Sequence, residues 1–334
     1  MPPVRLAVAL CAAATLALPV APSLAAKPKV VLSGAAFVSK ANKVRAAAGM
    51  PAMATSSAMT SGCVAHATYG ALNGDFDAAN PHSDTAGRRG YSAAGKKAGL
   101  ASILATNESW AQPFGPWSAA PFHLLQFLDP EVQTTGGATV RGAMDFLCMN
   151  THDGIGHRPA QDTFWSFPRD GGTIPPAEIA SEWPRVPTWD LHMGGSSMRS
   201  PKTGPEMFIY SDGPQELSNC TWVDDGHGGY QAIGDGGPVD PSTCTPNSDP
   251  PQAVTGVTLE GPGGAVPVKV LTSKQSNLVI RYQDILVPVK PLKPHAQYTL
   301  TVNLDTEHSD SDPNGDAPKP VTYVVHFTTT SGLL

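Results

Sequence analysis

The sequence predicts an α/β domain followed by a smaller all-β sandwich domain, and three observations support this prediction. Apolar residues recur at helical spacing over residues 36–49 and 54–72, and a strand-like apolar run follows at Ala138–Met149. Beyond Pro250-Pro251 the chain changes to short strands at roughly ten-residue spacing, which is typical of a sandwich. The length of 334 residues independently favours two domains.

The two predicted helices begin and end at residues suited to those positions. In the first, Phe37 and Ala41 share one face, and Gly49 ends the helix. In the second, Ser56 is a candidate N-cap and Cys63 lies on the apolar face. After these helices we expect a loop over residues 73–96 and a short helix over Ala120–Leu128 that ends at Asp129-Pro130.

The C-terminal part has the alternation of apolar and polar residues expected of half-buried strands, most clearly in Tyr298–Val302. Between residues 151 and 248, proline and glycine interrupt the apolar runs, and Met207–Tyr210 alone indicates a strand. The other predicted strands are Val254–Leu259, Val266–Leu271, Leu278–Tyr282 and Val321–Thr328.

Composition and charge exclude several classes of function. The net charge is −6 and Lys and Arg form no cluster, so we expect no nucleic-acid partner. Residues 1–25 have the features of a signal peptide, because Arg5 precedes an apolar run and Ser23-Leu24-Ala25 offers a cleavage site. No later apolar run is long enough for a transmembrane helix, so we expect a protein secreted to the extracellular space or the periplasm.

Four cysteines remain once the predicted signal peptide is removed. An even number in a secreted chain indicates two disulfides, for which three pairings are possible. We favour Cys63–Cys148 and Cys220–Cys244, since the second pair would close a loop of about 25 residues that is poor in apolar side chains. No Cys-x-x-Cys spacing is present, so a zinc site built from cysteines is disfavoured.

Several stretches, in order along residues 35–150, resemble the CAP superfamily, whose domain is also called the SCP domain. Asn42–Pro51 is similar to the N-x-x-R-x-x-x-G-[LM] motif of its first helix. Ala65–Tyr69 resembles its A-x-x-H-A-x-Y helix, and Trp117–His123 with Leu128–Pro130 resembles its bacterial W-x-x-S-P-x-H and L-x-P segments. The family includes cysteine-rich secretory proteins, insect venom antigens and plant pathogenesis-related proteins.

Two stretches near the C-terminus resemble the Ig-like β domain that follows the CAP domain in some bacterial members. Pro291–Val302 is similar to their P-L-x-P-x-x-x-Y-T-[LV]-x-V strand, and Phe327–Thr329 to their terminal F-T-T. The expected domains are therefore a CAP-like core over residues 33–150, a Pro/Gly-rich extension of it with a disulfide-bridged segment over 151–248, and an Ig-like sandwich over 250–331.

The resemblance implies an α-β-α sandwich with a cleft lined by two histidines and two acids, in which some members bind a divalent metal. Carried over residue by residue, His82 matches the first histidine, Glu108 the acid of the G-E-N motif and His123 the second histidine. The second acid belongs shortly before His123, but no Asp or Glu lies between Ser109 and Phe122. The expected set of cleft residues is therefore incomplete.

We expect the cleft to bind a small ligand, a lipid or a divalent cation such as Zn²⁺, with His82 and His123 as metal ligands and the Ig-like domain as a spacer or adhesion module. One alternative is a metal-assisted extracellular hydrolase that uses His82, Glu108 and His123, although no spare carboxylate remains as a general base. A second is a non-enzymatic protein that interacts with the cell envelope. For His66 on the second helix we expect packing rather than ligation.

Overall fold

The computed structural model of the chain describes residues 27–74, 80–142, 144–155, 164–177, 203–211, 221–224, 230–234, 237–238, 253–272, 278–279, 282–306 and 319–331. The predicted signal peptide and the predicted Cys220–Cys244 disulfide lie outside the described residues. Among the described residues, no helix has both the length and the hydropathy needed to span a membrane.

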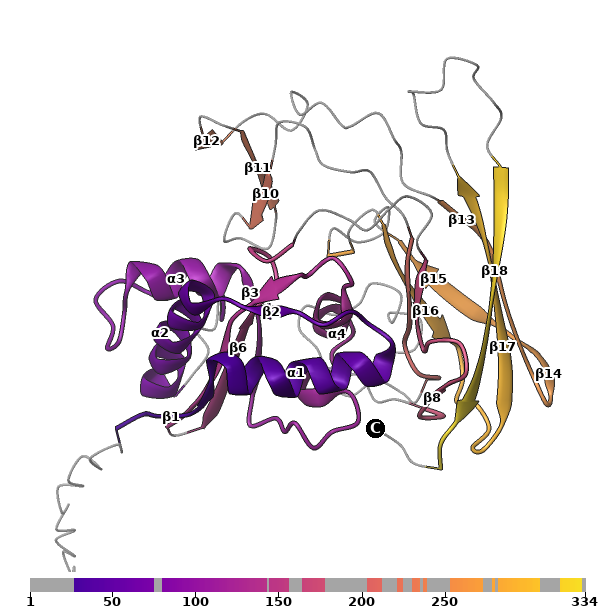
Figure 1. Cartoon of the computed structure of the whole chain (residues 1–334), viewed down its shortest axis with the longest axis horizontal. Helices are drawn as coiled ribbons and strands as arrows, with labels where there is room; N and C mark the ends of the chain where they lie inside the picture. Colours follow the sequence, from indigo (N-terminus) through magenta and orange to yellow (C-terminus); the bar gives the residue numbers. More distant parts are fainter. Residues whose placement is uncertain are drawn as a thin grey trace, which may run out of the picture.

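The N-terminal part is an antiparallel sheet with helices on both faces (Figure 1). The strand order is β1-β5-β6-β3. The strands are β1 (Lys29–Ser33), β3 (Ser102–Thr106), β5 (Gly137–Arg141) and β6 (Asp145–Asn150), and a two-stranded parallel pair is formed by β2 (Ala54–Thr55) and β4 (Thr134–Thr135). The helices are α1 (Gly34–Ala48), α2 (Ser57–Asn73), α3 (Ala93–Leu100) and α4 (Pro121–Leu128), with a 3-10 turn η1 (Gly115–Trp117).

Alternation along β5 and β6 explains why both faces of this sheet are covered. Gly137 lies so close to the ring of Phe37 on α1 that no side chain would fit there. The next residue, Ala138, points to the opposite face and packs with Cys63 of α2. Cys148 of β6 lies on that face too and forms the predicted disulfide with Cys63, with Cα atoms 5.3 Å apart. The sheet therefore separates α1 from α2, and the predicted three-layer α-β-α arrangement is present.

The predicted helix ends are confirmed. Gly49 has φ 85°, a left-handed conformation that favours glycine, and its N–H donates to the carbonyl of Ala46. The Ser56 side chain accepts from the N–H of Met59 at the start of α2. The short helix predicted before Asp129 is α4.

The loop predicted over residues 73–96 is wrong at its end, because α3 begins at Ala93. Ser92 caps this helix by accepting from the N–H of Gly95. Its buried residues are Gly95, Ala98 and Gly99, so its inner face is small rather than apolar. Hydrophobic periodicity therefore carries no signal for this helix.

The strand predicted at Ala138–Met149 is also wrong, because it consists of two strands, β5 and β6, in a hairpin. The turn is closed by the N–H of Gly142, which donates to Met144 O, and by an ion pair in which Arg141 Nε donates to Asp145 Oδ1 over 2.7 Å. Val140 and Phe146 face each other across the hairpin. The turn between them is short and contains no proline, so the sequence indicates one strand.

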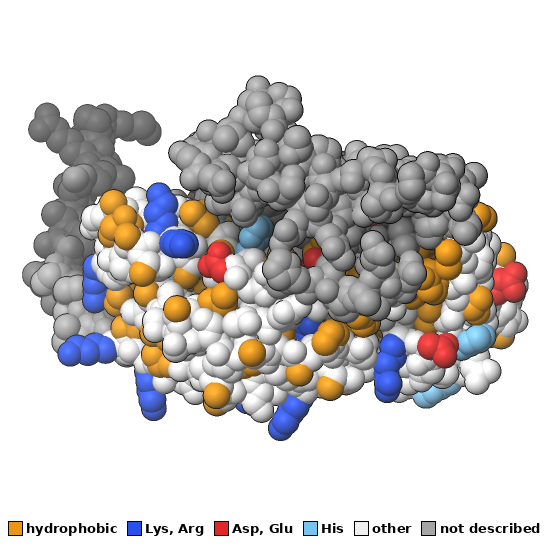
Figure 2. Space-filling model, turned by 45° about the horizontal axis from the view of Figure 1, so that its top comes forward, with side chains coloured by type: hydrophobic (Ala, Val, Ile, Leu, Met, Phe, Trp, Pro, Cys, Tyr) orange, Lys and Arg blue, Asp and Glu red, His pale blue; other side chains and the backbone are white. Residues whose placement is uncertain are grey.

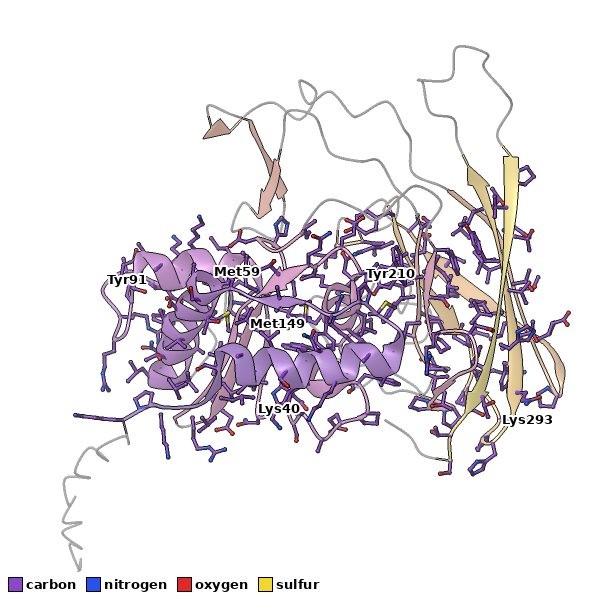
Figure 3. The ribbon with its side chains drawn as sticks, in the orientation of Figure 1. Lys40, Met59, Tyr91, Met149, Tyr210 and Lys293 are labelled. Carbon is purple, nitrogen blue, oxygen red and sulfur yellow. A yellow bond between two sulfur atoms is a disulfide. The ribbon has the colours of Figure 1, made fainter. Side chains whose placement is uncertain are left out.

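The C-terminal part consists mainly of two sheets, one antiparallel and one antiparallel except for its β18–β8 pair. One hydrophobic core joins residues of both sheets with residues of α1 and α4 (Figures 1 and 3). The four-stranded sheet contains β15 (Val268–Leu271), β16 (Gln283–Pro288), β9 (Met207–Tyr210) and β7 (Trp165–Phe167), in that order. The five-stranded sheet contains β14 (Gly264–Val266), β13 (Ala253–Gly261), β17 (Gln297–Thr306), β18 (Lys319–Thr329) and β8 (Gly172–Ile174). A separate sheet holds β10 (Thr221–Asp224), β11 (Tyr230–Gly234) and β12 (Gly237–Pro238).

Most predicted C-terminal strands are confirmed, but two differ. Val266–Leu271 is divided at Pro267 between β14 and β15, which belong to different sheets. Leu278–Tyr282 was predicted as a strand, whereas β16 begins at Gln283. Val279 and Tyr282 are nevertheless buried, so the apolar signal there came from core packing rather than from a strand.

Strand pairing crosses the predicted boundary near residue 250. β9 pairs with β16, and β8 pairs in parallel with β18, although β8 and β9 precede that boundary and their partners follow it. In the structure these segments of the 151–248 extension share the sheets of the C-terminal part. The division into domains itself stays a prediction.

Candidate functional site

His82 and His123 lie side by side, although they come from different elements. His82 lies in the segment between α2 and α3, and His123 lies in the first turn of α4. Their ring centroids are 6.2 Å apart and the ring planes differ by 22°. Both side chains are partly buried. The structure therefore brings together the two histidines that the sequence singled out.

The surroundings of His82 keep its ring neutral. The pKa of His82 is lowered to about 4, first because the ring is buried and then because His123 lies beside it. The ring Nδ1 is 3.0 Å from the carbonyl oxygen of Gly99, which opposes this shift. An imidazole that donates its Nδ1 proton to a carbonyl carries a lone pair on Nε2, the form in which histidine binds metals.

A third histidine, His66, pairs with the carboxylate of Asp84 close to His82. His66 Nδ1 of α2 is 2.6 Å from Asp84 Oδ1, and both side chains are almost fully buried. His66 also meets the ring of Phe146 edge-on, with centroids 5.6 Å apart. The expected packing role of His66 is therefore supported by a contact that joins α2 to the segment carrying His82.

Sequence reasoning assigned no role to Asp84, although it stands two residues after His82. The sequence did contain one signal: Asp84 is an ionisable residue that follows the predicted helix carrying His66. Charged side chains are almost never fully buried without a partner, so the pairing becomes evident once the burial of both is known. Spacing along the chain could not reveal it.

Gly99 on α3 lies next to both His66 and His82. A methyl group added at Gly99 would come within 2.5 Å of His66 Cε1 and would overlap the carbonyl oxygen of His82. The same residue accepts the hydrogen bond from His82. A glycine is required here because the helix, the His66 ring and the His82 backbone meet at one point.

Glu108 does not join the histidines. It lies beyond the C-terminal end of β3, whereas His82 contacts Gly99, which lies before the start of that strand. Five strand residues span about 16 Å. Glu108 instead lines a hollow of about 410 Å³ on the α1 side of the sheet, together with Lys40, Arg141 and Asp145. The predicted grouping of Glu108 with both histidines is thus not found in the structure.

Residues 38–151, about a third of the chain, match the model of the Cysteine-rich secretory protein family, CAP. These residues form a CAP domain. The resemblance inferred from the sequence is confirmed over this range. Comparisons with curated proteins and with solved structures gave no match.

The histidine pair places two imidazole rings side by side, and imidazole nitrogen is a common ligand of zinc. In the part of the chain that the structure describes, no three or more His, Cys, Asp or Glu side chains come together as a metal-binding group. Zinc sites in proteins usually use three or four protein ligands. The two histidines are one short of the three protein ligands of an open zinc site, so a cation held there would take its remaining ligands from water or a bound molecule.

Charged side chains on the described surface lie mostly apart from one another. Figure 2 shows Lys and Arg side chains on the described part of this face, two of them adjacent near one end and the others separate. The chain as a whole carries net charge −6.

Proposed function

We propose that the chain is an extracellular CAP-domain protein that binds a small ligand at the His82–His123 pair, and that this ligand is a divalent cation such as Zn²⁺. The observation that carries this proposal is the nearly parallel arrangement of the two rings, 6.2 Å apart. The low pKa of His82 supports it, because a neutral imidazole does not need to lose a proton before it binds a cation.

The hydrogen bond to Gly99 supports the same ligand class. Histidines that bind metals almost always donate their second ring N–H to a carbonyl or a carboxylate, which fixes the tautomer and the ring orientation. His82 has such a partner in the carbonyl of Gly99, at 3.0 Å. A borderline cation that accepts imidazole nitrogen, rather than Ca²⁺ or Mg²⁺, matches this donor set.

Binding is favoured over the alternative of hydrolysis. Metal-assisted hydrolysis needs a positioned general base in addition to the metal ligands. Glu108, the residue predicted for the set, is exposed and lies in the hollow with Lys40. Asp84 is almost fully buried against His66. Neither carboxylate is available to a water bound at the histidine pair.

Titration calorimetry with Zn²⁺ on the purified mature protein tests the proposal. We expect one equivalent of Zn²⁺ to bind to the native protein and the same site to be lost in a His82→Ala/His123→Ala variant. His326→Ala is the matched control, because His326 is an exposed histidine of β18. Equal binding by the native protein and the double variant would reject the histidine site.

The C-terminal strands are included in this proposal as an Ig-like module. Support comes from the resemblance of Pro291–Val302 and Phe327–Thr329 to such domains. Their predicted role as a spacer or adhesion module would place the CAP domain at a distance from whatever the strands contact.

A further inference from the structure

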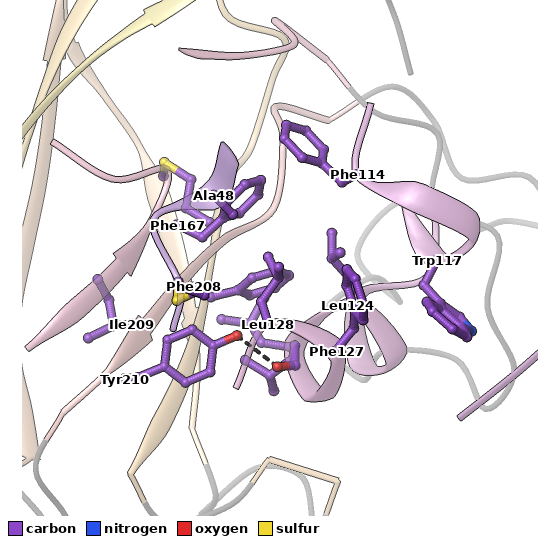
Figure 4. Close-up of a cluster of buried hydrophobic side chains, with 14 of the residues drawn as sticks. Ala48, Phe114, Trp117, Leu124, Phe127, Leu128, Phe167, Phe208, Ile209 and Tyr210 are labelled. Atoms are coloured by element: carbon purple, nitrogen blue, oxygen red, sulfur yellow. Dashed lines mark hydrogen bonds between the residues drawn. The ribbon is translucent and has the colours of Figure 1, made fainter. Parts of the chain in front are cut away.

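The C-terminal end of α4 is held by polar side chains from the four-stranded sheet. Tyr210 of β9 donates its hydroxyl to Leu125 O over 2.7 Å, a bond that Figure 4 draws. Tyr282 donates its hydroxyl to Asp129 Oδ2 over 2.7 Å, and Gln283 Nε2 donates to the same oxygen over 2.8 Å. Gln283 stands 154 positions from Asp129 in the sequence, so these bonds join distant parts of the chain.

Arg45 of α1 holds the same end from within the CAP domain. Its Nη1 donates to Phe127 O and to Asp129 O, over 2.6 and 2.9 Å, and its side chain is fully buried. Burial lowers the pKa of Arg45 to about 10, against the opposing charge of Asp129, so the group stays cationic at neutral pH. A cation at the C-terminal end of a helix stabilises the helix dipole.

Apolar packing fills the remaining space around this helix end. Leu124, Leu125, Phe127 and Leu128 are all almost fully buried. Figure 4 shows the rings of Phe208 and Tyr210 from β9 lying against the α4 side chains that include Leu128. Polar and apolar contacts on several sides therefore pack α4 against the four-stranded sheet and restrain its position.

His123 lies on this helix, two residues before Leu125. The supports of the two site histidines therefore come from different regions. His82 is held by Gly99, and the segment that carries it is held by the buried His66–Asp84 pair, all within the CAP domain. α4, and His123 with it, is held in part by Tyr210, Tyr282 and Gln283, which lie outside residues 38–151.

We infer that the C-terminal strands position His123 against His82 through their contacts with the end of α4. Tyr282 and Gln283, which donate to Asp129, are the positioning residues. This inference rests on the proposed function, since it concerns the same histidine pair. It also changes the role of the C-terminal strands. A spacer could be altered without effect on the site, whereas a positioning element could not.

The test uses the full-length mature protein and a Tyr282→Phe/Gln283→Leu variant. Thr322→Val is the matched control, because Thr322 donates a hydrogen bond to Asn303 on the exposed five-stranded sheet, away from α4. Two quantities are measured: the imidazole ¹⁵N and ¹H resonances of His82 and His123 in metal-free protein, and the Zn²⁺ dissociation constant.

We expect the His123 resonances to shift or broaden in the double variant while those of His82 change little. The Zn²⁺ affinity should fall about tenfold, the lower range for loss of groups that orient metal ligands. The control should match the native protein in both measurements. Tyr282→Phe alone keeps the aromatic ring, and it gives a milder version of the test if the double variant does not fold.

Unchanged His123 resonances in a folded double variant would overturn the inference. If the native protein binds no Zn²⁺, the proposed function fails, but the resonances still decide whether the strands position His123. If the double variant loses affinity with unchanged resonances, positioning is rejected and the proposed binding site stands.

Discussion

Two buried carboxylates, Asp129 and Asp284, lie on opposite faces of β16 and have different surroundings. Gln283 faces the CAP domain and donates to Asp129, whose other oxygen accepts from the N–H of Glu131 over 2.8 Å. The next residue, Asp284, points to the other face of the sheet. It is only 5% exposed, and the raised pKa of its carboxyl group has burial as its cause. Named donors stabilise the charge of Asp129, whereas the effect recorded for Asp284 is the loss of solvation on burial.

This difference shows that the neighbours, not the depth of burial, decide what a buried acid does. Asp129 joins two regions of the chain through its donors. Burial raises the pKa of Asp284 to about 8, so that the group is mostly protonated at neutral pH. The first carboxylate contributes to the structure, whereas the second makes the stability depend on pH.

The largest expected effect comes from removing the satisfied carboxylate. Asp129→Ala should lower the free energy of unfolding by about 3–5 kcal/mol, because it removes the buried oxygen that accepts from Tyr282 and Gln283 and the negative charge near Arg45. Urea denaturation measures the loss. Asp170→Ala, which removes an exposed acid, should change stability by less than about 0.5 kcal/mol. Similar losses for both would contradict the difference between the two carboxylates.

The carboxylate of Asp284 should show its effect as a pH dependence. The pKa of Asp284 is raised in the folded state, so between its unfolded value near 4 and about 8 the folded state binds the extra proton. Stability should therefore fall as pH rises through this range, by about 3 kcal/mol between pH 5 and pH 7 at full linkage.

Asp284→Asn tests this dependence, because the amide has the same size and does not titrate. The variant should lose this component of the pH dependence and be more stable than the native protein at pH 8. Thermal unfolding at several pH values measures both. A native protein whose stability is flat from pH 5 to pH 8 would contradict the raised pKa of Asp284.

Gly99→Ala tests a third buried carboxylate, Asp84, through its partner His66. The added methyl group meets the His66 ring and the carbonyl of His82, so we expect a loss of about 1–3 kcal/mol and a change in the His82 resonances. Gly263→Ala is the control, since its nearest neighbour is the flexible end of Lys293 at 3.4 Å. Equal stability of the two variants would show that α3 can move away from His66.

The smallest effect should come from one donor of Asp129. Tyr282→Phe keeps the buried ring and removes one hydrogen bond, so we expect a loss of about 1 kcal/mol in urea denaturation. In a double-mutant cycle with Asp129→Ala, the effect of Tyr282→Phe should nearly vanish. A cycle in which the two losses add would mean that the two groups do not interact.

Local signals in the sequence predicted much of the N-terminal part. Gly49 and Ser56 mark helix ends through their own backbone and side-chain chemistry, which does not depend on the rest of the fold. The hairpin between Arg141 and Asp145 was missed because its turn is short and contains no proline. α3 was missed because its buried face consists of Gly95, Ala98 and Gly99.

The candidate site was predictable only where motifs carry the information. His82 and His123 were chosen from short motifs and do lie together. Glu108 was chosen in the same way but lies at the other end of β3, because matching a short motif does not fix the register of a strand. The contact of Asp129 with Tyr282 has no local signal, since it depends on how the four-stranded sheet packs against α4.

The parallel pairing of β8 with β18 has a consequence for synthesis on the ribosome. The adjoining contact between Asp170 and His326 spans 156 positions, so β8 emerges long before its partner strand. The CAP domain, with its disulfide between Cys63 and Cys148, is complete before then. The nascent chain therefore presents β8 with an unpaired edge until the last strand, β18, emerges, and this is the interval in which a chaperone or a second nascent chain would compete for it.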